Sequence, residues 1–455
     1  MLDGRVKTLH PKVHAGILAV RGKKEHMDRL VQHNIPPIDI VAVNLYPFQS
    51  TVDKPDSTFD DAIENIDIGG PSLVRAAAKN HNDVTIVVDP ADYGLVLEEL
   101  QAGSVKAETK RALALKAFAH TAEYDAIIHR YLSGQFNPGR FSDDFILPLK
   151  KAYDLRYGEN PHQRAAFYVD GSKECGVANA KVISEGKQLS FNNIIDVNSA
   201  LELVKEFDEP AAVIVKHLNP SGVGVAGDIA SAYRLAHSAD SQSAFGCIVA
   251  LNREPDVAVA KDIISTFVEV VAAPSFPKEV LPILAKKEKM RLLQTGPMRK
   301  TSEKSMDYRR VVGGLLVQSP DIREVTEKDL KVVSKRKPTR DEIDAMLFAW
   351  KVCRHTKSNS IIFAKKDHTV GVGAGQMSRV DAVKIAAMKA KELAKGAAMA
   401  SDAFFPFRDG VDEAAKAGIT AAIHAGGSIR DAEVIQAADE HGMAMVFTGV
   451  RCFLH

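Results

Sequence analysis

Short apolar runs rich in β-branched residues alternate with segments of helical periodicity along this chain of 455 residues. The runs at 39–43, 84–88 and 213–215 are typical of buried strands. Between 113 and 128, apolar side chains recur every three or four residues, which predicts one face of a long helix. Strands that alternate with helices are typical of α/β domains, so we predict an α/β fold throughout.

The segment 133–144, SGQFNPGRFSDD, contains Gly, Pro and Ser without periodicity and predicts a domain boundary. A net charge of +1 does not favour nucleic acid as a partner, and no apolar run approaches the roughly 18 residues of a membrane span. We therefore expect a cytoplasmic protein. The four cysteines, Cys175, Cys247, Cys353 and Cys452, lack the spacing of a zinc site or of a disulfide framework.

The stretch VIVKHLNPSGVGVAG, residues 213–227, combines a strand signal with reactive side chains. Lys216 and His217 end the apolar run, and we expect the turn at 219–222, because Pro fixes φ and Gly tolerates positive φ. A cation beside an imidazole at a strand end suits proton transfer to a polarised acyl group. The alternative is a surface lysine next to a histidine that caps a turn.

The first domain carries a dense cation cluster and a polar strand end. RVKTLHPKVHAG supplies Arg5 and Lys7 among further Lys and His residues, which suits phosphate or carboxamide recognition, although a basic surface loop is the alternative. NLYPF places Asn44 and Tyr46 after a strand, where ligands of open α/β sheets gather, although a turn with core aromatic residues is the alternative.

A third stretch of the first domain, IDIGGPSLVRAAAKN, places two glycines before an expected helix with Pro71 at its start. The free N–H groups of such a helix start can bind an anion. Asp67 precedes the glycines, and Lys79 lies near the end of the expected helix.

In the second half, Phe245 and Gly246 precede a strand, so bare backbone can approach a ligand there. The glycines of 371–375 resemble a dinucleotide-binding loop only superficially, because no acidic residue follows at the required interval. The terminal RCFLH carries Arg451 and Phe453 and is expected either to dock into the site or to fray, as termini usually do.

Taken in order along the whole chain, these motifs closely resemble the bifunctional purine biosynthesis family, in which AICAR (phosphoribosylaminoimidazolecarboxamide) formyltransferase is fused to IMP cyclohydrolase. The motifs that carry the resemblance are RVKTLHPKVHAGIL, NLYPF, IDIGGPSLVRAAAKNH, RYGENPHQ, VKHLNPSG, SAFG, SNSIIFAK, GVGAGQMSR, SDAFFPFRDG and RCFLH. The resemblance implies formyl transfer from 10-formyltetrahydrofolate, a reduced folate, to the 5-amino group of AICAR, and then cyclodehydration of formyl-AICAR to IMP.

The resemblance also implies an architecture. Residues 1–140 are expected to form a methylglyoxal-synthase-like doubly wound cyclohydrolase domain. Residues 150–455 are expected to form the formyltransferase, built of two cytidine-deaminase-like α/β subdomains. It further implies a homodimer and no catalytic metal.

For formyl transfer, the resemblance assigns proton shuttling from the AICAR amine to His217, polarisation or positioning of the reacting groups to Lys216, and help in holding the formyl oxygen to Asn359. The positions expected to contact nucleotide or folate are Arg156, Tyr157, Asn193, Phe245, Gly246, Glu269, Arg451 and Phe453. The positions expected to serve ring closure are Lys7, Tyr46, Asp67 and Lys79, with Arg5 and Asn44 nearby. Which of the Lys, Tyr and Asp side chains acts as base, acid or oxyanion donor is left open by the motifs.

Members of the family begin with a further segment of about 60 residues, two βα units in length, that holds the substrate phosphate. This chain begins at MLDGRV. We therefore expect an N-terminally incomplete first domain, a chain that formylates AICAR but closes the ring poorly, and accumulation of formyl-AICAR.

Two functions of other classes compete with this interpretation. One is a zinc nucleoside deaminase, which a metal assay would reveal and against which the missing ligand spacing argues. The other is a non-catalytic nucleotide-binding protein, which AICAR binding without formyl transfer would support.

Overall fold

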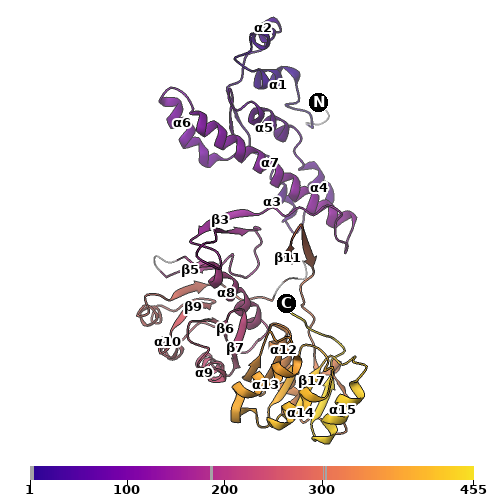
Figure 1. Ribbon diagram of the computed structural model, residues 1–455. Helices are drawn as coiled ribbons and strands as arrows, with labels where there is room; N and C mark the ends of the chain where they lie inside the picture. Colours follow the sequence, from indigo (N-terminus) through magenta and orange to yellow (C-terminus); the bar gives the residue numbers. More distant parts are fainter. Residues whose placement is uncertain (1–4, 185–187, 301, 303–304) are drawn as a thin grey trace. The chain divides into compact units, whose positions relative to one another are not determined.

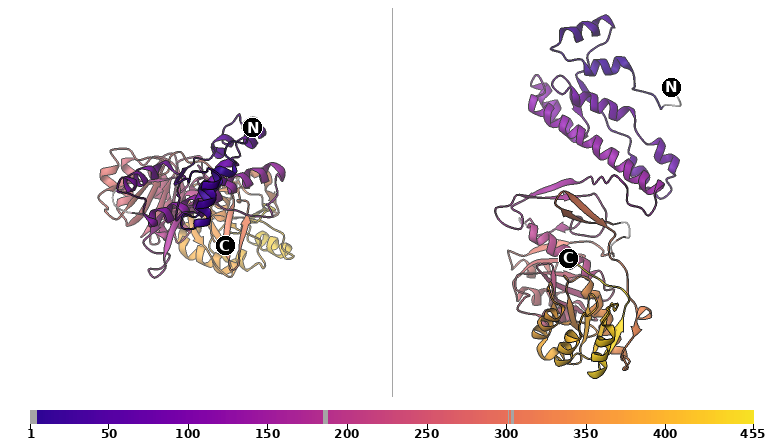
Figure 2. Two further views of the ribbon diagram at one scale, coloured as in Figure 1. Left: turned by 90° about the horizontal axis from the view of Figure 1, so that it is seen from above. Right: turned by 45° about the vertical axis from the view of Figure 1, so that its right-hand side comes forward.

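The computed structural model describes residues 5–184, 188–300, 302 and 305–455, so the first four residues of the chain lie outside it (Figure 1 and Figure 2). The chain divides into two compact units, Met1–Lys150 and Lys151–His455. Each unit has hydrophobic clusters of its own, and each is described by itself below.

In the first unit, a pair of parallel strands is flanked by helices. Its elements are α1 (Pro11–Leu18), α2 (Lys24–Gln32), β1 (Ile40–Ala42), α3 (Phe48–Val52), α4 (Phe59–Glu64), α5 (Gly69–Lys79), β2 (Thr85–Val87), η2 (Pro90–Asp92), α6 (Tyr93–Gln101) and α7 (Ala107–Phe136). Strands β1 and β2 pair in parallel, with Ile40 opposite Thr85. Ile86 of β2 packs with Leu113 and Ala117 of the long helix α7, which confirms the predicted helical stripe and the α/β class.

The second unit contains two six-stranded sheets with the same strand order, β5-β10-β9-β8-β6-β7 and β13-β18-β17-β16-β14-β15. The elements of the first sheet and its surroundings are β3 (Lys150–Leu155), β4 (Ala165–Val169), β5 (Lys181–Val182), α8 (Phe191–Val204), β6 (Ala211–Lys216), β7 (Asn219–Val225), α9 (Ile229–Ala239), β8 (Cys247–Leu251), α10 (Val257–Ile264), β9 (Val268–Ala273), α11 (Leu281–Leu284) and β10 (Arg291–Gln294). The second unit thus holds two α/β sheets of one topology, while their division into two cytidine-deaminase-like subdomains stays a prediction.

The second sheet follows a separate hairpin. The remaining elements are β11 (Asp307–Val311), β12 (Gly314–Gln318), η3 (Glu327–Asp329), β13 (Lys331–Val332), α12 (Arg340–Arg354), β14 (Ile361–Ala364), β15 (Thr369–Gly373), α13 (Arg379–Ala390), η4 (Lys391–Ala394), β16 (Ala398–Ser401), α14 (Asp409–Lys416), β17 (Ala421–His424), α15 (Asp431–Glu440) and β18 (Ala444–Phe447). Helices α12 to α15 cluster on this sheet in Figure 1. This part of the chain therefore also has the α/β class that was predicted throughout.

A core shared by the two sheets explains why the strands are apolar on both faces. Val213 and Val215 of β6 belong to a cluster that also contains Trp350 of α12. Their neighbours Ala212 and Ile214 point to the opposite face and belong to a separate cluster with α9 and α10. Helices α8 and α12 both contribute to the shared core, so the two subdomains fold against each other.

Glycines allow a helix to pack closely on the edge strand of each sheet. A Cβ atom on Gly222 of β7 would lie 1.9 Å from the carbonyl oxygen of Ala236 in α9, and one on Gly373 of β15 would lie 1.9 Å from that of Ala382 in α13. The glycines of the segment 371–375 that belong to β15 thus allow α13 to pack closely on this strand. This agrees with its merely superficial resemblance to a dinucleotide loop.

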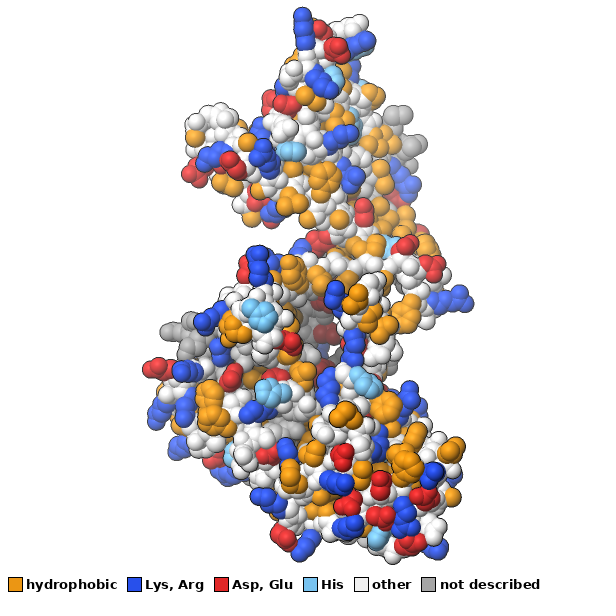
Figure 3. Space-filling view, in the orientation of Figure 1, with side chains coloured by type: hydrophobic (Ala, Val, Ile, Leu, Met, Phe, Trp, Pro, Cys, Tyr) orange, Lys and Arg blue, Asp and Glu red, His pale blue; other side chains and the backbone are white. Residues whose placement is uncertain are grey.

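The surface carries both signs of charge. Lys and Arg side chains lie interspersed with Asp and Glu over the face of the second unit in Figure 3. Among the described residues, no helix is long and apolar enough to cross a membrane.

Candidate active sites

The Lys216–His217 pair lies at a sharp chain reversal. Strand β6 ends at Lys216, His217 and Leu218 take φ values of 52° and 67°, and β7 begins at Asn219. This is a two-residue hairpin, in which both central residues occupy the left-handed region. The prediction that the strand stops at the pair is confirmed, but the turn predicted at 219–222 is wrong, because those residues already belong to β7.

Helix α8 holds this turn in place. The Leu218 N–H donates to Asp196 Oδ1 at 2.7 Å, and Ser199 Oγ donates to the Leu218 carbonyl at 2.8 Å. These contacts stabilise a left-handed conformation that costs energy for residues other than glycine. The imidazole of His217 is exposed beside them.

Asp196 was not predicted from the sequence. Burial raises the pKa of this carboxyl above its ordinary value, while the Leu218 N–H and the nearby His217 oppose that rise. On the same face of α8, Asn193 donates from Nδ2 to Glu269 Oε2 at 2.8 Å. The spacing of three residues between Asn193 and Asp196 on a predicted helix was the available signal.

Phe245 and Gly246 complete this side of the site. Lys216 Nζ donates to the Phe245 carbonyl at 2.8 Å, which joins the end of β6 to the start of β8. The Phe245 ring is 64% exposed and packs on Phe267 with ring centroids 5.3 Å apart. Gly246 has a φ of 72° and donates its N–H to the Phe267 carbonyl at 2.7 Å. An exposed aromatic face thus lies next to the lysine.

Asn219 links the turn to the second subdomain. Its Oδ1 accepts the Lys357 N–H at 3.0 Å, two residues before Asn359. The structure therefore brings the Lys216–His217 turn close to the SNS motif, residues 358–360, although 138 positions separate Asn219 from Lys357.

The Asn359 carboxamide is already engaged on both sides. Its Nδ2 donates to the carbonyls of Gln376 at 2.8 Å and Met377 at 3.2 Å, and its Oδ1 accepts Arg379 Nη2 at 2.6 Å. An amide NH₂ has two hydrogens to donate. Both hydrogens of Nδ2 and one lone pair of Oδ1 are therefore used within the protein, and the expected help of Asn359 in holding the formyl oxygen stays a prediction.

The carboxyl-terminal tail is docked and not frayed. The Ser358 N–H donates to the Leu454 carbonyl at 2.9 Å, and the Leu454 N–H donates to Ser358 Oγ at 3.1 Å. The Arg451 guanidinium lies 4.9 Å from the centre of the exposed Phe453 ring. The tail was expected either to dock or to fray, and in the structure it docks against Ser358.

Arg156 and Tyr157 form a similar stacked pair. The guanidinium lies 5.7 Å from the ring centre, at the end of β3. The loop that follows reaches α8, because Asn192 Nδ2 donates to the Glu159 carbonyl at 3.4 Å. This places the RYGENPHQ motif near the N-terminal end of the helix that carries Asn193 and Asp196.

A cavity of about 900 Å³ in the first unit gathers most of the residues predicted for ring closure. Arg5, Lys7, Asn44, Tyr46 and Asp67 all line it. Lys7 Nζ donates to the Tyr46 hydroxyl at 3.2 Å, and the Tyr46 N–H donates to Asp67 Oδ2 at 3.3 Å. The Arg5 guanidinium forms an ion pair with Glu64.

The start and the end of α5 each carry a group that was expected to take part in the site. The Gly70 N–H at the start of α5 donates to Asp67 Oδ1 at 2.8 Å. This N–H, which was expected to be free for an external anion, is therefore already bonded to a carboxylate of the protein itself. Lys79 is exposed at the other end of α5, roughly 15 Å along the helix from Gly69 at 1.5 Å per residue. The structure does not bring Lys79 into the cavity.

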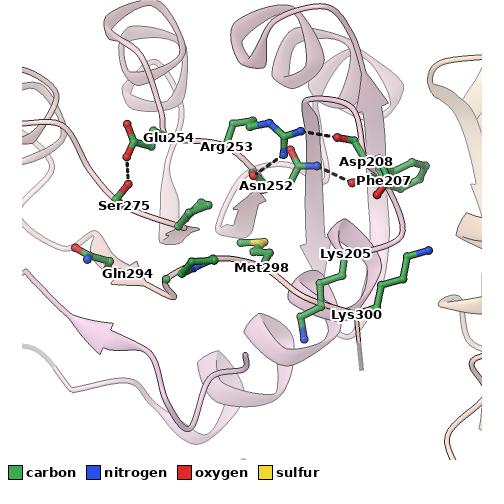
Figure 4. A pocket seen from close by; sticks show the side chains of 13 residues that line it. Lys205, Phe207, Asp208, Asn252, Arg253, Glu254, Ser275, Gln294, Met298 and Lys300 are labelled. Carbon is green, nitrogen blue, oxygen red and sulfur yellow. Dashed lines mark hydrogen bonds between the residues drawn. The ribbon is translucent and has the colours of Figure 1, made fainter. Parts of the chain in front are cut away.

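A further cavity of about 830 Å³ lies at the carboxyl ends of β8, β9 and β10 (Figure 4). Several of its polar groups pair with one another: Arg253 donates to the carbonyls of Asn252 and Asp208, and Ser275 donates to Glu254. Because β6 is antiparallel to β8, Lys216 lies at the opposite end of these strands. This cavity is therefore separate from the candidate formyl-transfer site.

Within the described residues, no three His, Cys, Asp or Glu side chains gather in a way that would hold a metal ion. All four cysteines are free thiols.

The sequence matches two protein families. Residues 77–389 match the family described as the AICARFT/IMPCHase bienzyme, and residues 1–72 match the MGS-like domain.

Curated relatives match over the whole chain. The chain is 55% identical to the bifunctional purine biosynthesis protein PurH of Magnetococcus marinus and 54% identical to that of Halalkalibacterium halodurans, covering 100% of this chain and 89% of each relative. Among solved structures, the crystal structure of ForH aligns at 36% identity over 29% of this chain and 69% of its own, with a TM-score of 0.25.

Proposed function

Because the chain belongs to the AICARFT/IMPCHase bienzyme family, we propose that it catalyses the last two steps of IMP synthesis. In the first step, a formyl group passes from 10-formyltetrahydrofolate to the 5-amino group of AICAR. In the second, formyl-AICAR loses water and closes to IMP. The observation that carries this proposal is the identity of more than half of all residues with proteins named for this bifunctional activity.

For formyl transfer, the geometry supports a role for the hairpin that carries Lys216 and His217. The AICAR amine attacks the formyl carbon and loses a proton, the bond between that carbon and N10 of the folate breaks, and N10 takes up a proton so that tetrahydrofolate leaves. The exposed imidazole of His217 is placed to accept that proton, with the Asp196 carboxyl beside it. The Lys216 ammonium, held by the Phe245 carbonyl, stabilises negative charge on the formyl oxygen.

Recognition of the two substrates is assigned to stacked and exposed groups. Arg156 with Tyr157, and Arg451 with Phe453, each present a guanidinium and an aromatic face, which suit a phosphate and a flat heterocycle. The exposed Phe245 ring offers a further aromatic surface for the folate or the base.

For ring closure, we assign the cavity that contains Lys7, Tyr46 and Asp67. The carboxamide nitrogen attacks the formyl carbon, and the formyl oxygen departs as water with one proton from that nitrogen and one from the formamide nitrogen. The Tyr46 hydroxyl, which accepts from Lys7 Nζ, is placed to donate to the developing oxyanion. Arg5 and Asn44 line the same cavity and are assigned to substrate binding, whereas the geometry supports no role for Lys79.

We also propose that the protein is a cytoplasmic homodimer. The support is the family resemblance, in which formyltransferase sites form between two chains, and the absence of disulfides among its four free cysteines.

The test follows AICAR, formyl-AICAR and IMP together by chromatography, with the full chain and 10-formyltetrahydrofolate. The unaltered chain is expected to consume AICAR. His217→Ala is expected to lower formyl transfer about 10²–10⁴-fold without loss of the fold, as for the removal of a general acid/base. Near-normal turnover of that variant would remove His217 from the mechanism, and AICAR binding without any formylation by the unaltered chain would overturn the proposed function.

A further inference from the structure

Arg379 is a buried cation in the second subdomain, with 8% of its surface exposed at the start of α13. Its guanidinium donates to three side chains. Nη2 donates to Asn359 Oδ1 at 2.6 Å, and Nη1 donates to Ser401 Oγ at 2.6 Å and to Asp402 Oδ1. Asp402 is fully buried, so this ion pair is shielded from water.

Arg379 determines which way the Asn359 amide faces. A guanidinium only donates, so the group turned toward it has to be Oδ1. The carbonyls of Gln376 and Met377 only accept, so the group turned toward them has to be Nδ2. The remaining lone pair of Oδ1 is thereby the single group that Asn359 can offer to a bound amine.

The same network reaches the carboxyl-terminal tail. Ser358 Oγ donates to Asp402 Oδ2 at 2.5 Å and accepts the Leu454 N–H at 3.1 Å. The Cys452 N–H donates to the Asp402 carbonyl at 2.9 Å. Asp402 therefore binds Arg379 through Oδ1, and it contacts the tail through its backbone carbonyl and, by way of Ser358, through Oδ2.

We propose that Arg379 is a positioning residue for formyl transfer, which fixes the Asn359 amide as an acceptor for the attacking amine and, through Asp402 and Ser358, fixes the tail that carries the assigned nucleotide contacts. This rests on the proposed function, in which AICAR accepts a formyl group and the tail contacts the substrate through Arg451 and Phe453. A guanidinium is required because a lysine ammonium cannot reach the three acceptors with the planar fork geometry.

Two variants separate the two parts of the network. Arg379→Lys keeps the charge beside Asp402 but loses the fork, so we expect kcat to fall about 10²-fold with little change in the KM for AICAR, as for a misplaced catalytic group. Ser358→Ala leaves Arg379 and Asn359 paired but cuts the side-chain link to Leu454. We expect it to raise the KM for AICAR about tenfold, equivalent to ~1.4 kcal/mol of binding, with little change in kcat.

Hydrogen exchange provides a readout that does not depend on activity. The backbones of Asn359 and Gln376 donate to each other at 3.1 and 3.3 Å. Exchange at these two amides is expected to accelerate in Arg379→Lys, and exchange at Leu454 is expected to accelerate in Ser358→Ala. The matched control is Arg340→Gln, which removes an exposed arginine that pairs with Glu327 and Asp344 at the far end of α12.

The inference is overturned if Arg379→Lys leaves both kcat and the exchange at Asn359 unchanged, or if Arg340→Gln has the same effects. An unaltered chain without formyl transfer would overturn the proposed function, while the exchange data would still decide whether Arg379 orders Asn359. If Arg379→Lys does not fold, Ser401→Ala removes one acceptor of Nη1 and is expected to lower kcat roughly threefold to tenfold. An unchanged kcat in that variant also contradicts the inference.

Discussion

Glu206 joins the two subdomains through a buried ion cluster, and its removal is expected to make the second unit less stable in a way that depends on pH. The carboxylate pairs with Arg354 and His355 at the end of α12, and only 12% of its side chain is exposed. Burial alone raises its pKa, but the contacts with His355 and Arg354 outweigh burial and lower the pKa from 4.5 to about 2.

The expected size follows from that pKa. One pKa unit corresponds to ~1.4 kcal/mol, so the ionised carboxylate contributes about 3 kcal/mol to the free energy of unfolding at neutral pH. Because the folded-state pKa is lower than the unfolded one, this stability is present above about pH 5 and is lost as the pH falls toward 2. Glu206→Gln is therefore expected to be less stable than the unaltered chain by about 3 kcal/mol at pH 7, with a gap that shrinks with acid.

Trp350 provides a fluorescence signal from which the free energy of unfolding can be measured. It is the single tryptophan of the chain, is 3% exposed, and lies in the core that the two sheets share. Its fluorescence in urea titrations at pH 7, 5, 4 and 3 reports unfolding of the second unit. The control Glu392→Gln removes an exposed partner of Lys395 and is expected to change stability by less than ~1 kcal/mol. An equal gap between Glu206→Gln and the unaltered chain at pH 7 and pH 3 would refute the reasoning.

Three further outcomes are expected. Gly222→Ala should destabilise the second unit by about 3 kcal/mol, because the new Cβ would collide with Ala236. The control Gly227→Ala, which has open space around it, should change the free energy of unfolding by less than ~0.5 kcal/mol. Similar urea midpoints for the two variants would contradict this prediction. Tyr46→Phe should slow the appearance of IMP about 10²-fold while formyl-AICAR still forms, and an unchanged IMP rate would exclude its assigned role. The active protein should sediment as a dimer, and active monomers at assay concentration would rule out the proposed assembly.

The amino-acid sequence by itself determined the class of fold and the main chemical groups. Strands such as 213–215 were predictable because burial on both faces requires a continuous run of β-branched residues. Lys216 and His217 were predictable as a pair at a strand end, since apolar periodicity stops there. Asn44 and Tyr46 of the first unit's cavity were found because polar groups after a strand lie at the ligand-binding edge of a parallel sheet.

Tertiary structure alone decided how these groups are held. The turn falls at His217 and Leu218 because Asp196 and Ser199 of α8 stabilise a left-handed backbone, a contact that local turn propensity does not contain. Gly222 serves close packing of α9 instead of that turn.

The hydrogen-bond partners of the SNS motif, residues 358–360, could not be predicted from the sequence either. Arg379 orients Asn359 from 20 positions away, and Asp402 joins Ser358 from 44 positions away, so no short-range pattern connects them. Sequence periodicity records which residues are buried, because burial is a local property of a helix face or a strand. The partner of a buried polar group is chosen by the chain's path through space, and for this protein only the packed sheets reveal it.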